Sequence, residues 1–264
     1  MEYQPLVHIP ALYLSIPYFL LLVLFNWLGY LYKNRQIKKY PDIVSSGLGT
    51  AEGSLLGLMA LLLSFAFGIS AAKYETRRQL LVEEANDIGT VILRCDLYPD
   101  SARNLFRADL KNYLEARILY YEVGDHADQI QNSLSRADSL AGLIWKRVAG
   151  LSHNTANTVA TMQMVPSLNA MIDIVSTREA SRKSVVPRLI LDILLILTLV
   201  SSFLTGYGSK GHERRRVLVI AFALMTTLAL YLVIDLDRPR QGYINLNSAQ
   251  QQMINLRSNF LNSQ

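Results

Sequence analysis

Long apolar runs alternate with polar segments along the chain, and four of these runs are long enough to cross a membrane. A helix needs about 20 apolar residues to span a hydrocarbon layer roughly 30 Å thick. Inside lipid the backbone must satisfy its own hydrogen bonds, which favours helices over open strands. Buried helices of a large soluble protein are a poorer interpretation, because such helices normally keep a polar face. The predicted spans are residues 11–32, 53–72, 189–208 and 217–234.

Basic residues gather in the first and third connections between these spans. Each connection holds four basic residues and one acidic residue, so each carries a net charge of +3. The positive-inside rule places both connections in the cytoplasm. No Lys or Arg precedes the first span, which argues against a cleaved signal peptide. The basic residues are Lys33, Arg35, Lys38 and Lys39 in the first connection and Lys210, Arg214, Arg215 and Arg216 in the third.

This charge pattern predicts the location and the topology of the protein. We expect a multi-pass protein of the bacterial plasma (inner) membrane. Its N- and C-termini and residues 73–187 are expected to lie outside the cytoplasm.

The segment between the second and third spans has helical periodicity throughout. Its first part continues the second span, and Pro99 ends that helix. A second helix follows, then a turn or linker at Gly124 and the polar run after it. Two further helices, about 133–149 and 155–183, return the chain to the third span. The fold class is therefore all-α: a polytopic membrane protein with four transmembrane helices and an extracytoplasmic helical bundle between helices two and three.

The same pattern divides the chain into four parts. The last part contains apolar positions that favour a short helix, either on the outer domain or on the membrane surface. The parts are a first transmembrane pair (1–72), an extracytoplasmic α-helical domain (73–187), a second transmembrane pair (188–234) and an extracytoplasmic C-terminal tail (235–264).

Small residues recur at spacings of three and four along the second span, and we call them the small-residue ridge. Lipid provides little hydrophobic drive between helices, so close backbone approach through small residues holds membrane helices together. The ridge is therefore an oligomer seam, a pore-lining face, or a packing surface for other spans of the same chain. The last of these is the most common use of such residues. The members are Gly49, Gly53, Gly57, Ala60, Ser64 and Gly68.

Charged residues cluster at the predicted outer ends of the spans, while Glu52 lies at the opposite end of the second span. A charge at mid-bilayer costs about 2.5–3.5 kcal/mol on insertion scales. All of these residues lie within a turn or two of an interface, where solvated or ion-paired charges are the simpler interpretation. Our hypothesis is a charged ring at the mouth between membrane and outer domain. Its candidates are Arg77, Arg78, Arg188, Asp192, Asp235, Asp237, Arg238 and Arg240.

Composition excludes several classes of protein. The chain is 51% apolar and 18% charged, against about a quarter charged in soluble domains, and its mean hydropathy is +0.20. The net charge of +5 comes without a basic stripe of interleaved aromatics, so we expect no nucleic-acid partner. The single cysteine, Cys95, excludes a disulfide scaffold. The sequence contains no catalytic constellation, zinc-ligand spacing or phosphate-binding loop, so we expect no enzyme, no metal and no cofactor.

Two stretches resemble the signature of a known family. Between Ala51 and Pro99 an apolar span opened by the dipeptide EG runs into RR and then into VEEAN and IGT. After the last span comes DLDRPRQGYI, from Asp235 to Ile244. The chain resembles a family of bacterial integral membrane proteins of unknown function termed bestrophin-like. Its C-terminal tail is longer and richer in Gln and Asn than that family's pattern. By analogy the resemblance implies a pentameric anion channel, and it carries over no catalytic or binding residues.

These observations give a leading hypothesis and an alternative. The leading hypothesis is a non-enzymatic membrane protein that self-associates in the lipid bilayer and conducts a small inorganic ion. Among such ions, an anion is the first choice. The alternative is a membrane-anchored sensor or scaffold, in which the outer helical domain binds a ligand or partner. The short cytoplasmic loops count against the alternative, because they leave little surface for signalling.

Overall fold

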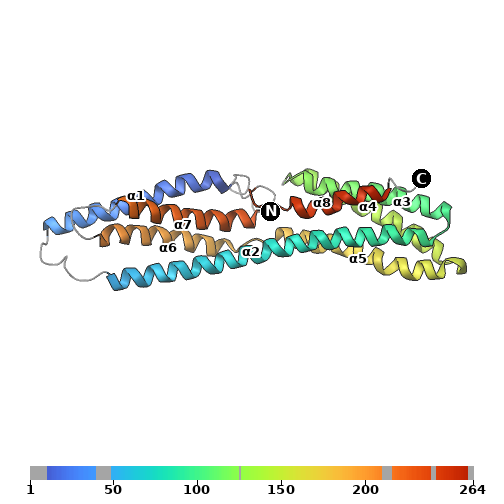
Figure 1. Cartoon of the computed structure of the whole chain (residues 1–264), viewed down its shortest axis with the longest axis horizontal. Helices are drawn as coiled ribbons and strands as arrows, with labels where there is room; N and C mark the ends of the chain where they lie inside the picture. Colours follow the sequence, from blue (N-terminus) through green and yellow to red (C-terminus); the bar gives the residue numbers. More distant parts are fainter. Residues whose placement is uncertain (1–10, 40–48, 125, 210–215, 239–241, 261–264) are drawn as a thin grey trace. The chain divides into compact units, whose positions relative to one another are not determined.

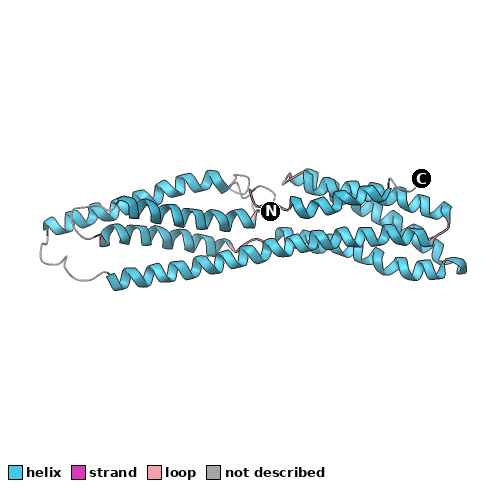
Figure 2. Cartoon of the chain, viewed as in Figure 1, coloured by secondary structure: helices cyan, strands magenta, loops and turns pink. Residues whose placement is uncertain are grey.

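The structure is a computed structural model, and it describes residues 11–39, 49–124, 126–209, 216–238 and 242–260. Within these residues all regular secondary structure is helical (Figures 1 and 2). The helices are α1 (Ala11–Lys39), α2 (Gly49–Arg94), α3 (Asp100–Glu122), α4 (Ala127–Ser152), α5 (Thr158–Lys183), α6 (Arg188–Gly208), α7 (Arg216–Asp237) and α8 (Asn247–Asn255). Three short 3-10 helices accompany them in the described part of the chain: η2 (Cys95–Leu97), η3 (Thr155–Asn157) and η4 (Leu256–Phe260).

Four of these helices are long and apolar enough to cross a membrane, as the sequence predicts. The chain divides into two compact units. We call residues 1–73 and 185–244 the membrane unit, and residues 74–184 and 245–264 the bundle unit. Helix α2 is one continuous element whose first part belongs to the membrane unit and whose last part belongs to the bundle unit.

In the membrane unit, α1 packs against both α6 and α7. The apolar core contains Ala66 from α2, Leu194 from α6, and Leu230 and Val233 from α7. The closest approach is between α1 and α6, where Gly29 lies against the backbone of Phe203 and Gly206 lies against the backbone carbonyl of Asn26. Glycine at both positions allows the two backbones to touch.

Polar side chains run along the same contact between α1 and α6. Asn26 Nδ2 donates to the carbonyl of Ser202 at 3.1 Å, and Ser202 Oγ donates to the carbonyl of Leu22 at 2.7 Å. The hydroxyls of Tyr18 and Thr198 also bond across the contact. In lipid such bonds add to van der Waals packing in holding helices together.

The bundle unit has its own apolar core, built from α2, α3, α4, α5 and α8. Helix α4 begins at Ala127, earlier than the predicted start near residue 133, so most of the expected polar linker is helical. The physical reason is that Ile130 and Ala137 continue the buried stripe of this helix into the polar run. Gly124 makes the turn before it with a φ of +62°, a conformation that glycine adopts without strain.

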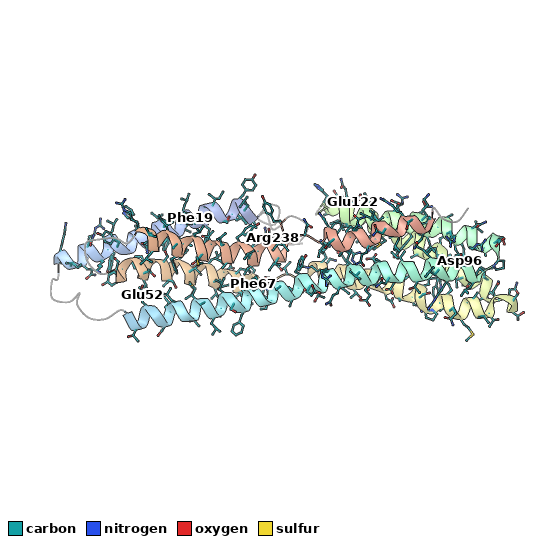
Figure 3. The ribbon with its side chains drawn as sticks, viewed as in Figure 1. Phe19, Glu52, Phe67, Asp96, Glu122 and Arg238 are labelled. Carbon is teal, nitrogen blue, oxygen red and sulfur yellow. The ribbon has the colours of Figure 1, made fainter. Side chains whose placement is uncertain are left out.

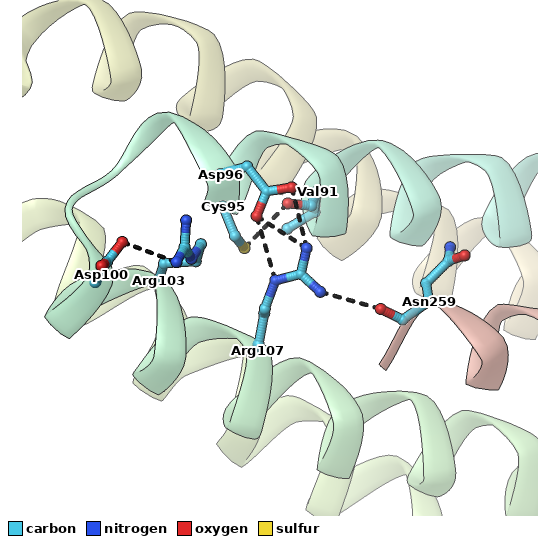
Figure 4. A network of polar contacts seen from close by, with 7 residues as sticks. All are labelled: Val91, Cys95, Asp96, Asp100, Arg103, Arg107 and Asn259. Carbon is cyan, nitrogen blue, oxygen red and sulfur yellow. Dashed lines mark hydrogen bonds and ion pairs between the residues drawn. The ribbon is translucent and has the colours of Figure 1, made fainter. Parts of the chain in front are cut away.

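The C-terminal segment belongs to the bundle unit. Helix α8 packs against α3, and Met253 is fully buried in the bundle core. Two surface contacts also hold the segment. Arg257 makes two hydrogen bonds to the Glu115 carboxylate, at 2.8 and 2.6 Å. Arg107 of α3 binds the carboxylate of Asp96 in η2 and donates to the carbonyl of Asn259 in η4 at 3.0 Å (Figure 4).

Candidate functional site

The small-residue ridge lies on an exposed face of α2. Ala60 and Ser64 are exposed. A Cβ atom built at Gly53, Gly57 or Gly68 would meet no atom of the described chain within 4 Å. Gly49 is the first residue of α2. Gly53, Gly57 and Gly68 therefore have open space beside them within the described chain, and the use of the ridge stays a prediction.

The opposite face of α2 makes the intramolecular contacts. Met59, Ala66 and Ser70 are buried. An α-helix turns by about 100° per residue, so these positions share one side of the helix, and the ridge occupies the other side. Large apolar side chains are also exposed on α2, including Phe65 and Phe67 (Figure 3). Among the described residues, the packing of the membrane unit thus leaves the ridge positions from Gly53 to Gly68 uncovered.

Two of the predicted acidic residues hold backbone amide groups at the end of α7. Asp235 is 1% exposed, and its carboxylate accepts the amides of Tyr243 at 3.2 Å and Ile244 at 2.9 Å. Asp237 accepts the amide of Val186 through both oxygens, at 3.1 and 3.2 Å. The turn is closed by the amide of Arg238, which donates to the Asp235 carbonyl at 3.1 Å. These two aspartates therefore fix the chain around the last span.

The other predicted charged residues described in the membrane unit lie near the starts of α6 and α2. On α6, Nε of Arg188 lies 3.9 Å from Oδ2 of Asp192, and the two side chains are 70% and 54% exposed. Glu52, at the start of α2, lies against Gly208 near the end of α6. Exposed pairs such as Arg188–Asp192 contribute about 0–1 kcal/mol. Arg240 falls outside the described residues.

The two arginines of the RR motif belong to the bundle unit and differ in burial. Arg77 is buried, and its guanidinium donates to the carbonyls of Ser184 at 2.8 Å and Ser181 at 3.4 Å. It therefore satisfies carbonyls at the C-terminal end of α5, where a positive charge is also favourable. Arg78 is exposed and pairs with Glu75 at 2.8 Å. The charged ring stays a prediction: the partners of Arg77 are carbonyls at the end of α5, and the partner of Arg78 is Glu75 on its own helix.

A buried cluster of charges, which the sequence analysis did not single out, lies inside the bundle unit. Glu84 of α2 is fully buried between Arg117 of α3 and Arg178 of α5. Arg117 donates to it through Nε, and through Nη2 at 3.3 Å, and Arg178 donates through Nη1. The Tyr120 ring lies beneath both guanidinium groups. Its centroid is 4.6 Å from Cζ of Arg117 and 5.5 Å from Cζ of Arg178. We call these four residues the Glu84 cluster.

The electrostatics of the Glu84 cluster are unusual for a protein interior. Two guanidinium groups face one carboxylate, and cation–π contacts with the Tyr120 ring add further stabilisation. Burial alone would lower the pKa of Arg117, but the neighbouring Glu84 carboxylate raises it above its usual value. Within the described chain, Arg117 Nη1 is buried and has no hydrogen-bond partner. The cluster ties three helices together at a single point.

The sequence does contain a signal for this cluster. Glu84 stands three residues after Leu81 and four before Ile88, both of which are buried. Arg117 and Arg178 also fall three or four residues after buried apolar positions of their helices. A charge on the apolar stripe of a helix must be paired, because an unpaired buried charge is very costly. What the spacing could not reveal is which of the charges face each other.

No reactive centre emerges from the described residues. The Cys95 thiol is buried and donates to the carbonyl of Val91 at 3.2 Å (Figure 4). The described part of the chain contains no group of three His, Cys, Asp or Glu side chains that could hold a metal ion. The features that stand out are an exposed helix face in the membrane unit and a buried charge cluster in the bundle unit.

The fold and these features define a polytopic, all-helical membrane protein. The sequence profile of the Bestrophin-like domain matches residues 20–250 of the chain. The protein therefore belongs to the Bestrophin-like family, as the motifs around Glu52 and Asp235 predict. No curated protein sequence matches the chain.

Solved structures show the same fold at low sequence identity. A crystal structure of a bacterial bestrophin homologue from Klebsiella pneumoniae, solved by Zn-SAD phasing, is 13% identical with a TM-score of 0.71. The match covers 92% of this chain and 98% of that one. A single-site variant of the Klebsiella homologue is 14% identical with a TM-score of 0.72, and the match covers 95% of this chain and 97% of that one. These similarities establish the fold.

Proposed function

We propose that the chain is one subunit of a homo-oligomeric anion channel in the bacterial inner membrane. The observation that carries the proposal is the exposed small-residue ridge of α2. A stripe of Gly, Ala and Ser facing lipid would gain nothing from its small side chains. The same stripe facing another helix, or a pore, allows close approach of backbones.

Family membership supports the choice of an anion channel over other oligomeric membrane proteins. The bestrophin relationship implies anion conduction by analogy at the level of the fold. The basic residues at the outer ends of the spans fit this choice, because a positive potential raises the local concentration of anions. The proposal includes the charged ring, and it assigns no catalysis, metal or cofactor to the chain.

The topology is part of the proposal. Both short connections carry a net charge of +3, which supports a cytoplasmic position for them. The N- and C-termini and the helical domain between the second and third spans then lie outside the cytoplasm. In this scheme residues 1–72 and 188–234 form the two transmembrane pairs, and residues 73–187 and 235–264 are extracytoplasmic.

The proposal is tested by substituting one member of the ridge. Ala60→Leu places a bulky side chain on the ridge, and we expect it to change the oligomeric state and to reduce chloride flux at least about tenfold. Oligomeric state is measured by native mass spectrometry, and flux by chloride efflux from liposomes that contain the purified protein.

A matched control separates the ridge from general effects of added bulk. Ala221→Leu makes the same change at an exposed position of α7, where it should leave both oligomeric state and flux unchanged. A monomeric wild-type protein, or an oligomer without chloride flux, would contradict the channel. Equal effects of the two substitutions would contradict the role of the ridge.

The sensor or scaffold is a second candidate, favoured by the continuity of α2. One uninterrupted helix, Gly49–Arg94, contributes to both units and could transmit a shift from one to the other. A monomeric protein without conductance, but with a ligand in its bundle unit, would favour this function.

A further inference from the structure

A surface pocket in the bundle unit lies between the start of α3 and the end of α4. Its volume is about 350 Å³, which is within the range of small-molecule sites. Its wall is mainly apolar, with Leu105 and Phe106 from α3 and Leu151 from α4. Ser101 contributes a hydroxyl in the first turn of α3, where backbone amides lack partners within the helix.

The pocket also contains one cationic group that is only partly used. Arg147 lines it, and its side chain is 33% exposed. Its Nε donates to Asp109 Oδ2 at 2.6 Å, which holds the guanidinium in place. The two terminal nitrogens of Arg147 make no hydrogen bond to any residue that the structure describes. A guanidinium that is fixed at Nε and free at its other edge suits the planar, two-oxygen geometry of a carboxylate.

We propose that this pocket binds a small amphipathic carboxylate, with one carboxylate group and a compact apolar body. The terminal nitrogens of Arg147 bind the carboxylate, and the apolar wall takes the body of the ligand. A cation of the same shape is rejected, because the site would place it against the guanidinium. The site is separate from the α2 ridge, so its test is independent of channel activity.

Gly150 provides a position at which bulk can be added to the pocket wall. It lines the pocket without a side chain, and a Cβ built there would meet no described atom within 4 Å. Gly150→Leu therefore adds an apolar side chain at the pocket wall while keeping the pair of Arg147 and Asp109. Leucine is also the better helix former. Gly142 on the same helix has equally open surroundings but does not line the pocket, so Gly142→Leu is a matched control.

The experiment uses the full chain in lipid nanodiscs and fluorine NMR. The probe is para-fluorophenylacetate, and para-fluorophenethylamine serves as the cation of similar shape. We expect the acid to show saturable line broadening and the amine to show none. Gly150→Leu should weaken binding of the acid at least about tenfold, and Gly142→Leu should leave it unchanged. Arg147→Lys should weaken it about tenfold, because the two-oxygen contact is lost.

Two results would overturn the proposal. One is equal broadening of the fluorine NMR lines of the amine and the acid, which indicates that both probes partition into lipid or detergent-like surfaces. The other is a Gly150→Leu variant that binds the acid as tightly as the wild type does, which places the probe elsewhere on the protein. Circular dichroism and thermal unfolding of each variant establish that its fold is intact, so a loss of binding is assigned to the pocket.

Discussion

Glu84 is a buried charge at the point where α2, α3 and α5 of the bundle unit meet. It is fully buried and is the carboxylate partner of two arginines from different helices. Replacing an entire buried ion pair with apolar groups is often neutral. Removing only the shared carboxylate is different, because two buried cations are then left facing each other.

We therefore expect Glu84→Gln to destabilise the protein strongly. Breaking a buried pair from one side costs about 3–5 kcal/mol, which corresponds to a fall of roughly 10 °C in the unfolding midpoint. The measurement is thermal unfolding followed by circular dichroism in lipid nanodiscs.

The neighbouring residue is a close control for this change. Glu83 is exposed, and Glu83→Gln removes the same charge from the same turn of α2. Its effect should be within about 0.5 kcal/mol, as for most surface substitutions. If both substitutions lower the midpoint equally, the loss comes from the net charge of the helix and the cluster has no special role.

At the scale of elements, α1 and α6 are joined by backbone contact. A Cβ at Gly206 would overlap the backbone carbonyl of Asn26, which cannot move without shifting α1. The hydrogen bond from Asn26 Nδ2 to the carbonyl of Ser202 depends on the same close approach. The contact therefore combines packing and hydrogen bonding in one stretch of helix.

Gly206→Ala should accordingly separate the two helices and destabilise the membrane unit. Overpacking of a close contact costs about 1–3 kcal/mol, and the loss of the Asn26 hydrogen bond adds to it. Cysteine crosslinking between α1 and α6, together with the unfolding midpoint, measures the change. The control is Gly142→Ala on α4, which has open surroundings and should be neutral or stabilising by up to about 1 kcal/mol.

The sequence predicts elements better than it predicts their contacts. The apolar runs locate the four candidate spans, and the periodicity after Lys73 correctly continues the second span as one helix. The direction of the α2 ridge was not predictable in the same way, since a run that is apolar on all sides does not show which face is covered. The glycines of the α1–α6 contact, Gly29 and Gly206, likewise acquire their role only when two distant segments meet.

At the scale of the whole molecule, the proposed topology makes the sharpest prediction. The native Cys95 is buried, so the wild-type protein provides an unlabelled background for cysteine accessibility. Asn132→Cys on α4 and Lys38→Cys on α1 both replace exposed residues. In right-side-out spheroplasts, a membrane-impermeant maleimide should label Asn132→Cys fully and should label Lys38→Cys only after the membrane is permeabilised.

The physical basis of this expectation is the charge of the short connections. Lys38 belongs to a connection with a net charge of +3, and such segments are retained in the cytoplasm. Residues 73–187 give no comparable constraint, because long segments cross largely regardless of charge. Labelling of Lys38→Cys alone in intact spheroplasts would reverse the topology and place the helical domain in the cytoplasm. The membrane spans and the α2 ridge would keep their roles in that case, but the charged residues at the outer span ends would face the cytoplasm instead.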